Sequence, residues 1–209
     1  MSETNDTVRW DTWNSAGGPK YPHDKVIQFL FRRYPDPQIR MHRDVLDLGC
    51  GSGVHMRFLT REGFRAHGRD ISPVAIRNTL QSLTAAGLEA ASLAVGSVDQ
   101  IDASDESFDA IVCIGVLDCA GPARLSAALG EIVRVLRPGG SALAVFASDK
   151  DFRCQGANPL EIHGFSDDEV KDAVSAACAN AKAVWTDRFI TTYENMKIQQ
   201  NEHLLTIIK

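Results

Sequence analysis

The middle of the chain alternates between two hydrophobic patterns, short apolar runs and longer amphipathic segments. The apolar runs, such as residues 45–48 and 108–114, are typical of buried parallel strands. The expected strands cover residues 45–48, 66–70, 91–95, 108–114 and 142–146. The amphipathic segments have apolar residues at helical spacing and cover residues 54–61, 72–87, 122–136 and 166–179. Strands and helices that alternate in this way predict an α/β fold with a doubly wound, mostly parallel sheet.

The two ends of the chain depart from this alternation. The first twenty residues are polar and aromatic and predict an irregular arm, followed by a helix over 23–33 that ends at Pro35-Asp36-Pro37. The last residues predict two strands, 184–193 and 203–208, separated by a polar stretch that suits an antiparallel hairpin. These two strands bring the expected sheet to seven, and we expect residues 1–209 to form a single domain.

Composition narrows the class of protein. The 209 residues are 44% hydrophobic and 23% charged, as in an ordinary globular domain, and the net charge of -5 argues against a broad nucleic-acid surface. No apolar run reaches the roughly 20 residues of a membrane span, and no secretory signal is recognised. The five cysteines are odd in number and lack zinc-type spacing, which favours reduced thiols. We therefore expect a cytoplasmic protein that binds neither membrane nor nucleic acid.

A glycine-rich turn follows the first strand and carries the clearest chemistry. Asp47 to Gly53 has the pattern D-x-G-x-G-x-G, whereas dinucleotide-binding turns have G-x-G-x-x-G. Asp47 would repel a pyrophosphate but suits a ligand with a cationic amine, such as the amino-acid end of S-adenosylmethionine (SAM). Asp70 ends the second strand and can accept hydrogen bonds from ribose hydroxyls. A NAD-dependent oxidoreductase is the alternative that this pattern opposes.

Four segments together resemble the motifs of class I SAM-dependent methyltransferases, in the family's order and at its spacing. They are residues 45–53, 68–72, 108–112 and 136–140, within a resemblance that extends roughly from Asp44 to Ala147. The resemblance implies a Rossmann-like fold of the small-molecule methyltransferase type, with SAM as the cofactor.

The resemblance also implies how SAM is bound. The turn would pass close to the methionine part, Asp47 would contact the amino group and Asp70 would hold the ribose. Ser97 departs from the family, because many relatives carry an aspartate there that contacts adenine. The residues expected to bind SAM are Tyr21, Asp47, Gly49, Cys50, Gly51, Asp70, Ile71, Ser97, Val98 and Ile114.

The candidate catalytic residues are His163 and Asp118. His163 lies between the fifth strand and the last helix, where a base could take a proton from a hydroxyl acceptor. The alternative is a surface histidine near the cap of that helix. Asp118 follows the fourth strand, where relatives often carry histidines. Arg153 could bind an anionic acceptor, and His55, at the start of the helix after the turn, is expected to contact cofactor or solvent.

The arm, residues 1–34, is a candidate lid, because similar proteins fold such an extension over SAM. Trp10 and Trp13 would exclude water, and Lys20 or Tyr21 would meet the SAM carboxylate. The alternative places the two tryptophans on the outside of the sheet as structural anchors.

Motifs that the sequence lacks narrow the class of methyl acceptor. The chain has no Asn-Pro-Pro-Tyr motif of the DNA amino-methyltransferases, no basic cluster and no paired-carboxylate metal site, so we expect no metal. We therefore expect methyl transfer to an oxygen or nitrogen of a small molecule. A non-catalytic SAM-binding or partner-binding protein and a protein or tRNA methyltransferase remain alternatives, and a homodimer stays open.

Overall fold

The computed structural model describes residues 3–156 and 160–209. Within these residues the chain forms a seven-stranded sheet with the strand order β3-β2-β1-β4-β5-β7-β6, which confirms the predicted Rossmann-like architecture. The chain divides into two compact units, one running up to Ser97 and including Ser107–Val112, the other made of Val98–Glu106 and Cys113–Lys209. Strand β4 (Phe108–Ile114) contributes residues to both units.

The strands of the first unit are parallel. β1 (Asp44–Leu48) pairs with β2 (Arg65–Asp70) and with β4, and β2 pairs with β3 (Ser92–Val95). The register sets Leu48 opposite Arg69. The carboxyl ends of β1 and β2 therefore lie side by side, which brings the glycine turn next to Asp70.

Three helices of the first unit, α2, α4 and α5, begin close to where the sequence predicted them. α4 (Val54–Arg61) follows the glycine turn, and α5 (Pro73–Ala85) has Ser72 as its cap, whose Oγ accepts from the backbone N–H of Ala75. α2 (Asp24–Arg33) is capped by His23, and a short α3 (Pro37–Arg40) comes before β1. Serine followed by proline favours a helix start because the side chain satisfies an otherwise free N–H.

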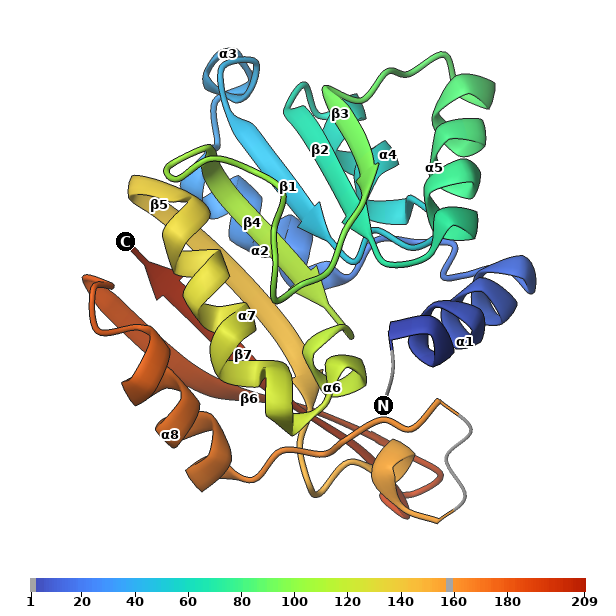
Figure 1. The fold of residues 1–209 in the computed structure, drawn as a ribbon, viewed down its shortest axis with the longest axis vertical. Helices are drawn as coiled ribbons and strands as arrows, with labels where there is room; N and C mark the ends of the chain where they lie inside the picture. The colour runs from blue at the N-terminus through green and yellow to red at the C-terminus, as the bar shows by residue number, and fades with distance from the viewer. Residues whose placement is uncertain (1–2, 157–159) are drawn as a thin grey trace. The chain divides into compact units, whose positions relative to one another are not determined.

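The prediction of an irregular arm is wrong for its first part, which is helix α1 (Glu3–Ser15). Figure 1 shows α1 beside α5, and hydrogen bonds join the two. Asn78 donates through Nδ2 to the Asn14 carbonyl, and Asp11 accepts from the Ser72 hydroxyl and the Val74 N–H. The helix has no clear apolar stripe, so hydrophobic periodicity could not reveal it.

The second unit contains the antiparallel hairpin. β7 (Ile198–Ile208) pairs antiparallel with both β5 (Leu136–Ala147) and β6 (Ala183–Tyr193), as predicted. Two boundaries were wrong: the predicted turn at 138–140 lies inside β5, and β7 begins five residues before 203. The polar residues 199–202 still pair with β6, so polarity did not mark the end of the strand.

Helices complete the second unit. α6 (Leu117–Ala120) follows β4, α7 (Pro122–Val135) precedes β5, and the short 3-10 helix η1 (Phe152–Cys154) follows it. α8 (Asp167–Ala177) packs beside α7 (Figure 1) and has the capping box that its sequence predicts. No helix among the described residues has the length and apolar character needed to cross a membrane.

Candidate active site

The glycine turn is fixed to the end of β2 by backbone hydrogen bonds. The N–H groups of Gly49 and Cys50 both donate to the Arg69 carbonyl, at 2.7 and 3.0 Å. Gly53 has a φ of 79°, and a Cβ there would lie 2.8 Å from Thr79 Oγ1. The turn therefore requires glycine at that position both for its backbone conformation and for its close approach to α5.

Asp70 links the glycine turn to the start of α5. Its side chain is 9% exposed and accepts from the Gly51 N–H at 2.8 Å and from the Ser72 N–H at 2.9 Å. Burial raises the pKa of this carboxyl, and the two backbone hydrogen bonds oppose that shift. Each oxygen accepts one backbone bond and keeps a further lone pair, which is available to a ligand hydroxyl.

Asp47 is buried and incompletely paired. It is 1% exposed, and its Oδ2 has no hydrogen-bond partner among the described residues. The His55 ring lies beside it, with Nδ1 3.6 Å from Oδ1. A buried carboxylate oxygen without a donor is costly to the fold, so this atom fits a ligand that brings a cationic amine.

Cys50 lies in the same turn with its thiol buried. Burial, followed by the charges of Asp47 and Asp70, raises the pKa of the thiol well above its usual value. The neutral thiol packs near Thr79, whose Oγ1 lies 3.9 Å from the sulfur. Its side chain therefore contributes packing rather than charge.

The remaining predicted SAM contacts divide between the two units. Ile71 and Ser97 are half-buried in the first unit, and the Gly96 N–H donates to the Asp70 carbonyl, which fixes the loop after β3. Val98 and Ile114 belong to the second unit. Tyr21 is 82% exposed. The first unit thus brings together the predicted set at the ends of β1 and β2, which is Asp47, Gly49, Cys50, Gly51, Asp70 and Ile71.

The arm lies directly on the glycine turn. A Cβ at Gly18 would be 2.5 Å from Ser52 Oγ, and one at Gly51 would be 3.7 Å from Asn14 Oδ1. Arm and turn enclose a hollow of about 390 Å³ to which Lys20 and Arg57 bring positive charge. Sequence reasoning missed Asn14 and Arg57, because neither lies in a motif or in a periodic pattern. The sequence analysis did name Lys20, as a residue of the arm that would meet the SAM carboxylate.

In the second unit, Asp118 lies on α6 and is also buried and incompletely paired. It is 1% exposed, its Oδ2 accepts from the Ala147 N–H at 3.0 Å, and its Oδ1 has no partner among the described residues. Burial raises the pKa of Asp118 to about 6, against the hydrogen bond from Ala147 and the positive charge of Arg153. The negative charge of Glu202 adds to the rise.

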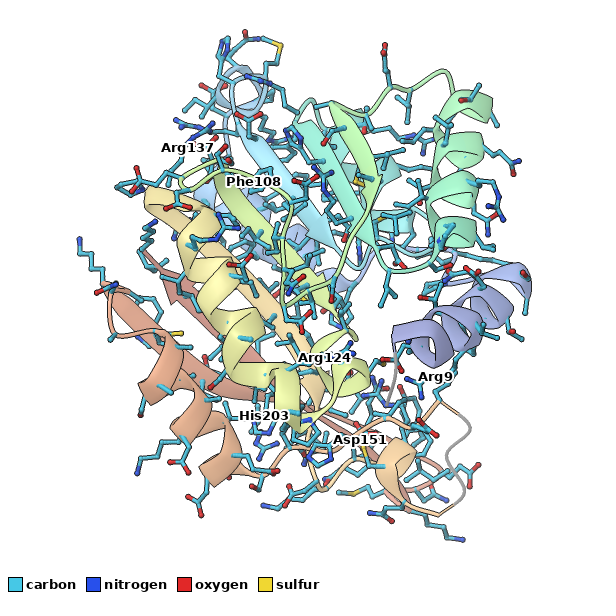
Figure 2. The ribbon with its side chains drawn as sticks, in the orientation of Figure 1. Arg9, Phe108, Arg124, Arg137, Asp151 and His203 are labelled. Atoms are coloured by element: carbon cyan, nitrogen blue, oxygen red, sulfur yellow. The ribbon has the colours of Figure 1, made fainter. Side chains whose placement is uncertain are left out.

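Arg153 belongs to a buried ion-pair cluster and is not the open anion site that the sequence suggested. Its guanidinium donates to both oxygens of Asp151 at 2.9 Å and to Oε1 of Glu202 at 2.7 Å. Asp151, labelled in Figure 2, also accepts from the Asn201 N–H. Oε2 of Glu202 is buried and has no partner among the described residues. Sequence reasoning missed Glu202 because it lies in the polar stretch that was assigned to the hairpin turn.

His163 is joined to Asp118 through the backbone, since its N–H donates to the Asp118 carbonyl at 2.8 Å. Its ring packs edge-on against Phe165, and its Nε2 lies 3.2 Å from Oε1 of Glu169 in the capping box of α8. The structure thus brings the backbones of the two candidate catalytic residues together, although they are 45 positions apart in the sequence. It places the histidine ring at the helix cap, as the alternative interpretation expects, and the role of His163 as a base stays a prediction.

The comparisons with known proteins agree with the motifs. Residues 45–140 match the model of a methyltransferase domain family. The chain is 34% identical over 160 residues to the uncharacterized methyltransferase Rv3342 of Mycobacterium tuberculosis (strain H37Rv), covering 76% of this chain and 59% of that protein. It is 28% identical over 102 residues to a ubiquinone biosynthesis O-methyltransferase of Alkalilimnicola ehrlichii, covering 48% and 40%.

The chain therefore spans about three-fifths or less of the length of these two relatives. A structure solved for the conversion of a disulfide bond into a thioacetal group during echinomycin biosynthesis has the same fold. It has a TM-score of 0.71 and 20% identity, and it covers 100% of this chain and 91% of that one.

Proposed function

Because residues 45–140 match a methyltransferase domain family and the chain is 34% identical over 160 residues to an uncharacterized methyltransferase, we propose that it is a class I methyltransferase that transfers the SAM methyl group to an oxygen or nitrogen of a small-molecule acceptor. The proposal rests on one observation made in each unit separately: Asp47 in the first unit and Asp118 in the second are buried, and each keeps one oxygen without a donor among the described residues. In this proposal Asp47 binds the cofactor and Asp118 serves the acceptor.

The residues of the first unit fit SAM. Asp47 Oδ2 lacks a donor and would accept a hydrogen bond from the amino group of SAM, which also satisfies its buried charge. Asp70 keeps an acceptor site on each oxygen for the ribose hydroxyls. When bound, SAM supplies a methyl group on a positively charged sulfur, and the sulfur becomes neutral as the methyl group leaves.

Asp118 would hold the proton that the acceptor gives up. The acceptor lone pair forms the new bond to the methyl carbon while the carbon–sulfur electron pair returns to sulfur. A hydroxyl acceptor must also lose its proton, and an acceptor amine loses one during or after transfer. With a pKa of about 6, Asp118 is mostly ionised at pH 7 and its free Oδ1 can take that proton. Burial, opposed by the Ala147 hydrogen bond and the charge of Arg153, keeps the pKa near the working pH of a general base.

The charges around Asp118 favour an acceptor that donates hydrogen bonds. Asp151 and Glu202 both pair with the single guanidinium of Arg153, which leaves the cluster with more carboxylates than cations. An anionic acceptor would be repelled there, whereas a hydroxyl or amine would supply the donors that Asp118 and Glu202 lack. The name of the ubiquinone biosynthesis O-methyltransferase relative supports oxygen as one acceptor atom.

The test is a transfer assay with SAM labelled on its methyl group and a panel of phenols, alcohols and amines. Each compound is paired with an analogue that is already O-methylated or N-acetylated. We expect label on members with a free hydroxyl or amine, and about a hundredfold slower transfer by Asp118→Asn. Asp36→Asn, at an exposed helix cap, is the matched control. Saturable SAM binding without transfer to any member of the panel would favour the alternative of a non-catalytic SAM-binding protein.

A further inference from the structure

His55 connects the Asp47 carboxylate to the arm, here residues 3–34. Its Nε2 accepts from the backbone N–H of His23 at 3.1 Å, while its Nδ1 lies 3.6 Å from Asp47 Oδ1. We propose that His55 is a positioning residue that holds the arm at the SAM site only while its ring is neutral. This inference rests on the proposed function, since it assigns the amino group of SAM to Asp47.

The hydrogen bond to His23 determines where the ring of His55 carries its proton. A backbone N–H can only donate, so Nε2 must offer a lone pair, and a neutral ring then has its hydrogen on Nδ1. That N–H faces Asp47 and supports its negative charge without forming a full ion pair. Oδ2 of Asp47 stays available to the cofactor. The neutral tautomer therefore serves the arm and the cofactor site together.

Protonation of His55 would disturb both contacts. A hydrogen on Nε2 removes the lone pair that receives the His23 N–H, so two donors would face each other at the start of α2. The positive ring would also pair fully with Asp47 and compete with the amino group of SAM for the same carboxylate. Both effects would weaken SAM binding once the His55 ring is protonated.

Other titratable groups near this contact call for controls. At the start of α2, His23 Nδ1 accepts from the Lys25 N–H and lies 3.3 Å from Asp24 Oδ1. The pKa of Asp70 is raised by burial, and its protonation would weaken ribose binding. Substitutions at His55 and His23 separate these contributions, because His55 receives the backbone N–H of His23 and not its side chain.

The experiment is calorimetric titration of SAM into the full chain at pH 7.0 and pH 5.5. We expect the wild type to bind SAM about tenfold more weakly at pH 5.5 than at pH 7.0, because that is the effect of losing one hydrogen bond near a charge. His55→Gln keeps an acceptor at the position of Nε2 but does not titrate, so its affinity should change less than about threefold between the two pH values. Its affinity at pH 7.0 should fall by a few-fold, since the N–H that faces Asp47 is lost. His23→Asn keeps the backbone N–H and a helix cap, so it should lose about tenfold like the wild type.

Different outcomes overturn different statements. No saturable binding by the wild type at pH 7.0 would overturn the SAM site itself. Binding at pH 7.0 with an equal loss on acidification in wild type and His55→Gln would overturn the role of His55 alone and assign the effect to Asp70. A second readout needs no ligand: the His23 amide should exchange with solvent about tenfold faster in His55→Ala than in wild type at pH 7.0. Equal exchange would show that His55 does not hold the arm.

Discussion

Replacing Asp118 with asparagine should stabilise the fold near neutral pH while removing the proposed base. Asparagine has the same shape, and its Oδ1 can still accept from the Ala147 N–H that Asp118 binds. Its amide group removes the buried charge and the oxygen that lacks a donor. Removing a charge that the native state holds at a cost raises the free energy of unfolding.

The expected change in the free energy of unfolding follows from the pKa of Asp118. The shift from 3.8 to about 6 corresponds to about 3 kcal/mol. Because the folded state binds this proton more tightly than the unfolded chain, the stabilising contribution of Asp118 is complete below the unfolded pKa of 3.8 and lost as the pH rises through about 6. Integration between pH 4.5 and 7.5 gives about 2 kcal/mol. Asp118→Asn has no carboxyl group at this position, so its free energy of unfolding does not change with pH for this reason.

Urea unfolding of both proteins at pH 4.5 and pH 7.5 tests this reasoning. The free energy of unfolding of Asp118→Asn minus that of wild type should rise by about 2 kcal/mol between the two pH values, with unchanged m-values. Asp36→Asn, which keeps an exposed helix cap, should show no such rise. A pH-independent difference for Asp118→Asn would refute the raised pKa, and with it the argument that this carboxylate is tuned for proton transfer.

Four further substitutions test other parts of the site and fold. Asp70→Ala should weaken SAM binding at least about tenfold in calorimetry, since it removes two charged acceptors for the ribose, and unchanged affinity would remove that assignment. His163→Ala should lower turnover with labelled SAM while sparing SAM affinity, and normal turnover would exclude it as the base. Ser166→Ala should cost about 1 kcal/mol in thermal or urea unfolding, because the α8 capping box is lost. Gly53→Ala should cost about 1 kcal/mol or more in the same assay, because φ is 79° and the new Cβ meets Thr79.

Local rules were enough for the central fold. Strands buried on both sides, such as Phe108–Ile114, are mostly apolar, and helix starts at Ser72 and Ser166 depend on a side chain that bonds to a nearby N–H. Each of these features is decided within a few residues of sequence. The sequence predicted a mostly parallel sheet of seven strands with a terminal antiparallel hairpin, which the structure confirms, but it did not predict the order of the strands.

Features that depend on distant partners could not be predicted in this way. Helix α1 is held through bonds from Asp11 to residues about 60 positions away, and no local apolar stripe announces it. The pairing of Arg153 with Glu202 spans 49 positions, so the sequence left the arginine available to an anionic ligand. Hydrophobic periodicity records burial against a core, and it carries no information about which polar groups meet.

The buried carboxylates of this chain differ in whether both of their oxygens have a hydrogen-bond donor. Asp109 accepts from Arg43 and the Asp44 N–H, and Asp151 binds Arg153 and Asn201, so both oxygens of each have a donor. Among the described residues, three carboxylates keep a buried oxygen that has no hydrogen-bond donor, namely Asp47, Asp118 and Glu202.

A fold gains nothing from such atoms, because each costs the hydration it has lost. Two of the three carboxylates were chosen from sequence alone, Asp47 for its position near the end of β1 and Asp118 for its position after β4. The third, Glu202, lies on β7 opposite Ala147, whose N–H binds Asp118. The same reasoning that assigns Asp118 to the acceptor therefore extends to Glu202, and a donor group of the acceptor is what both would bind.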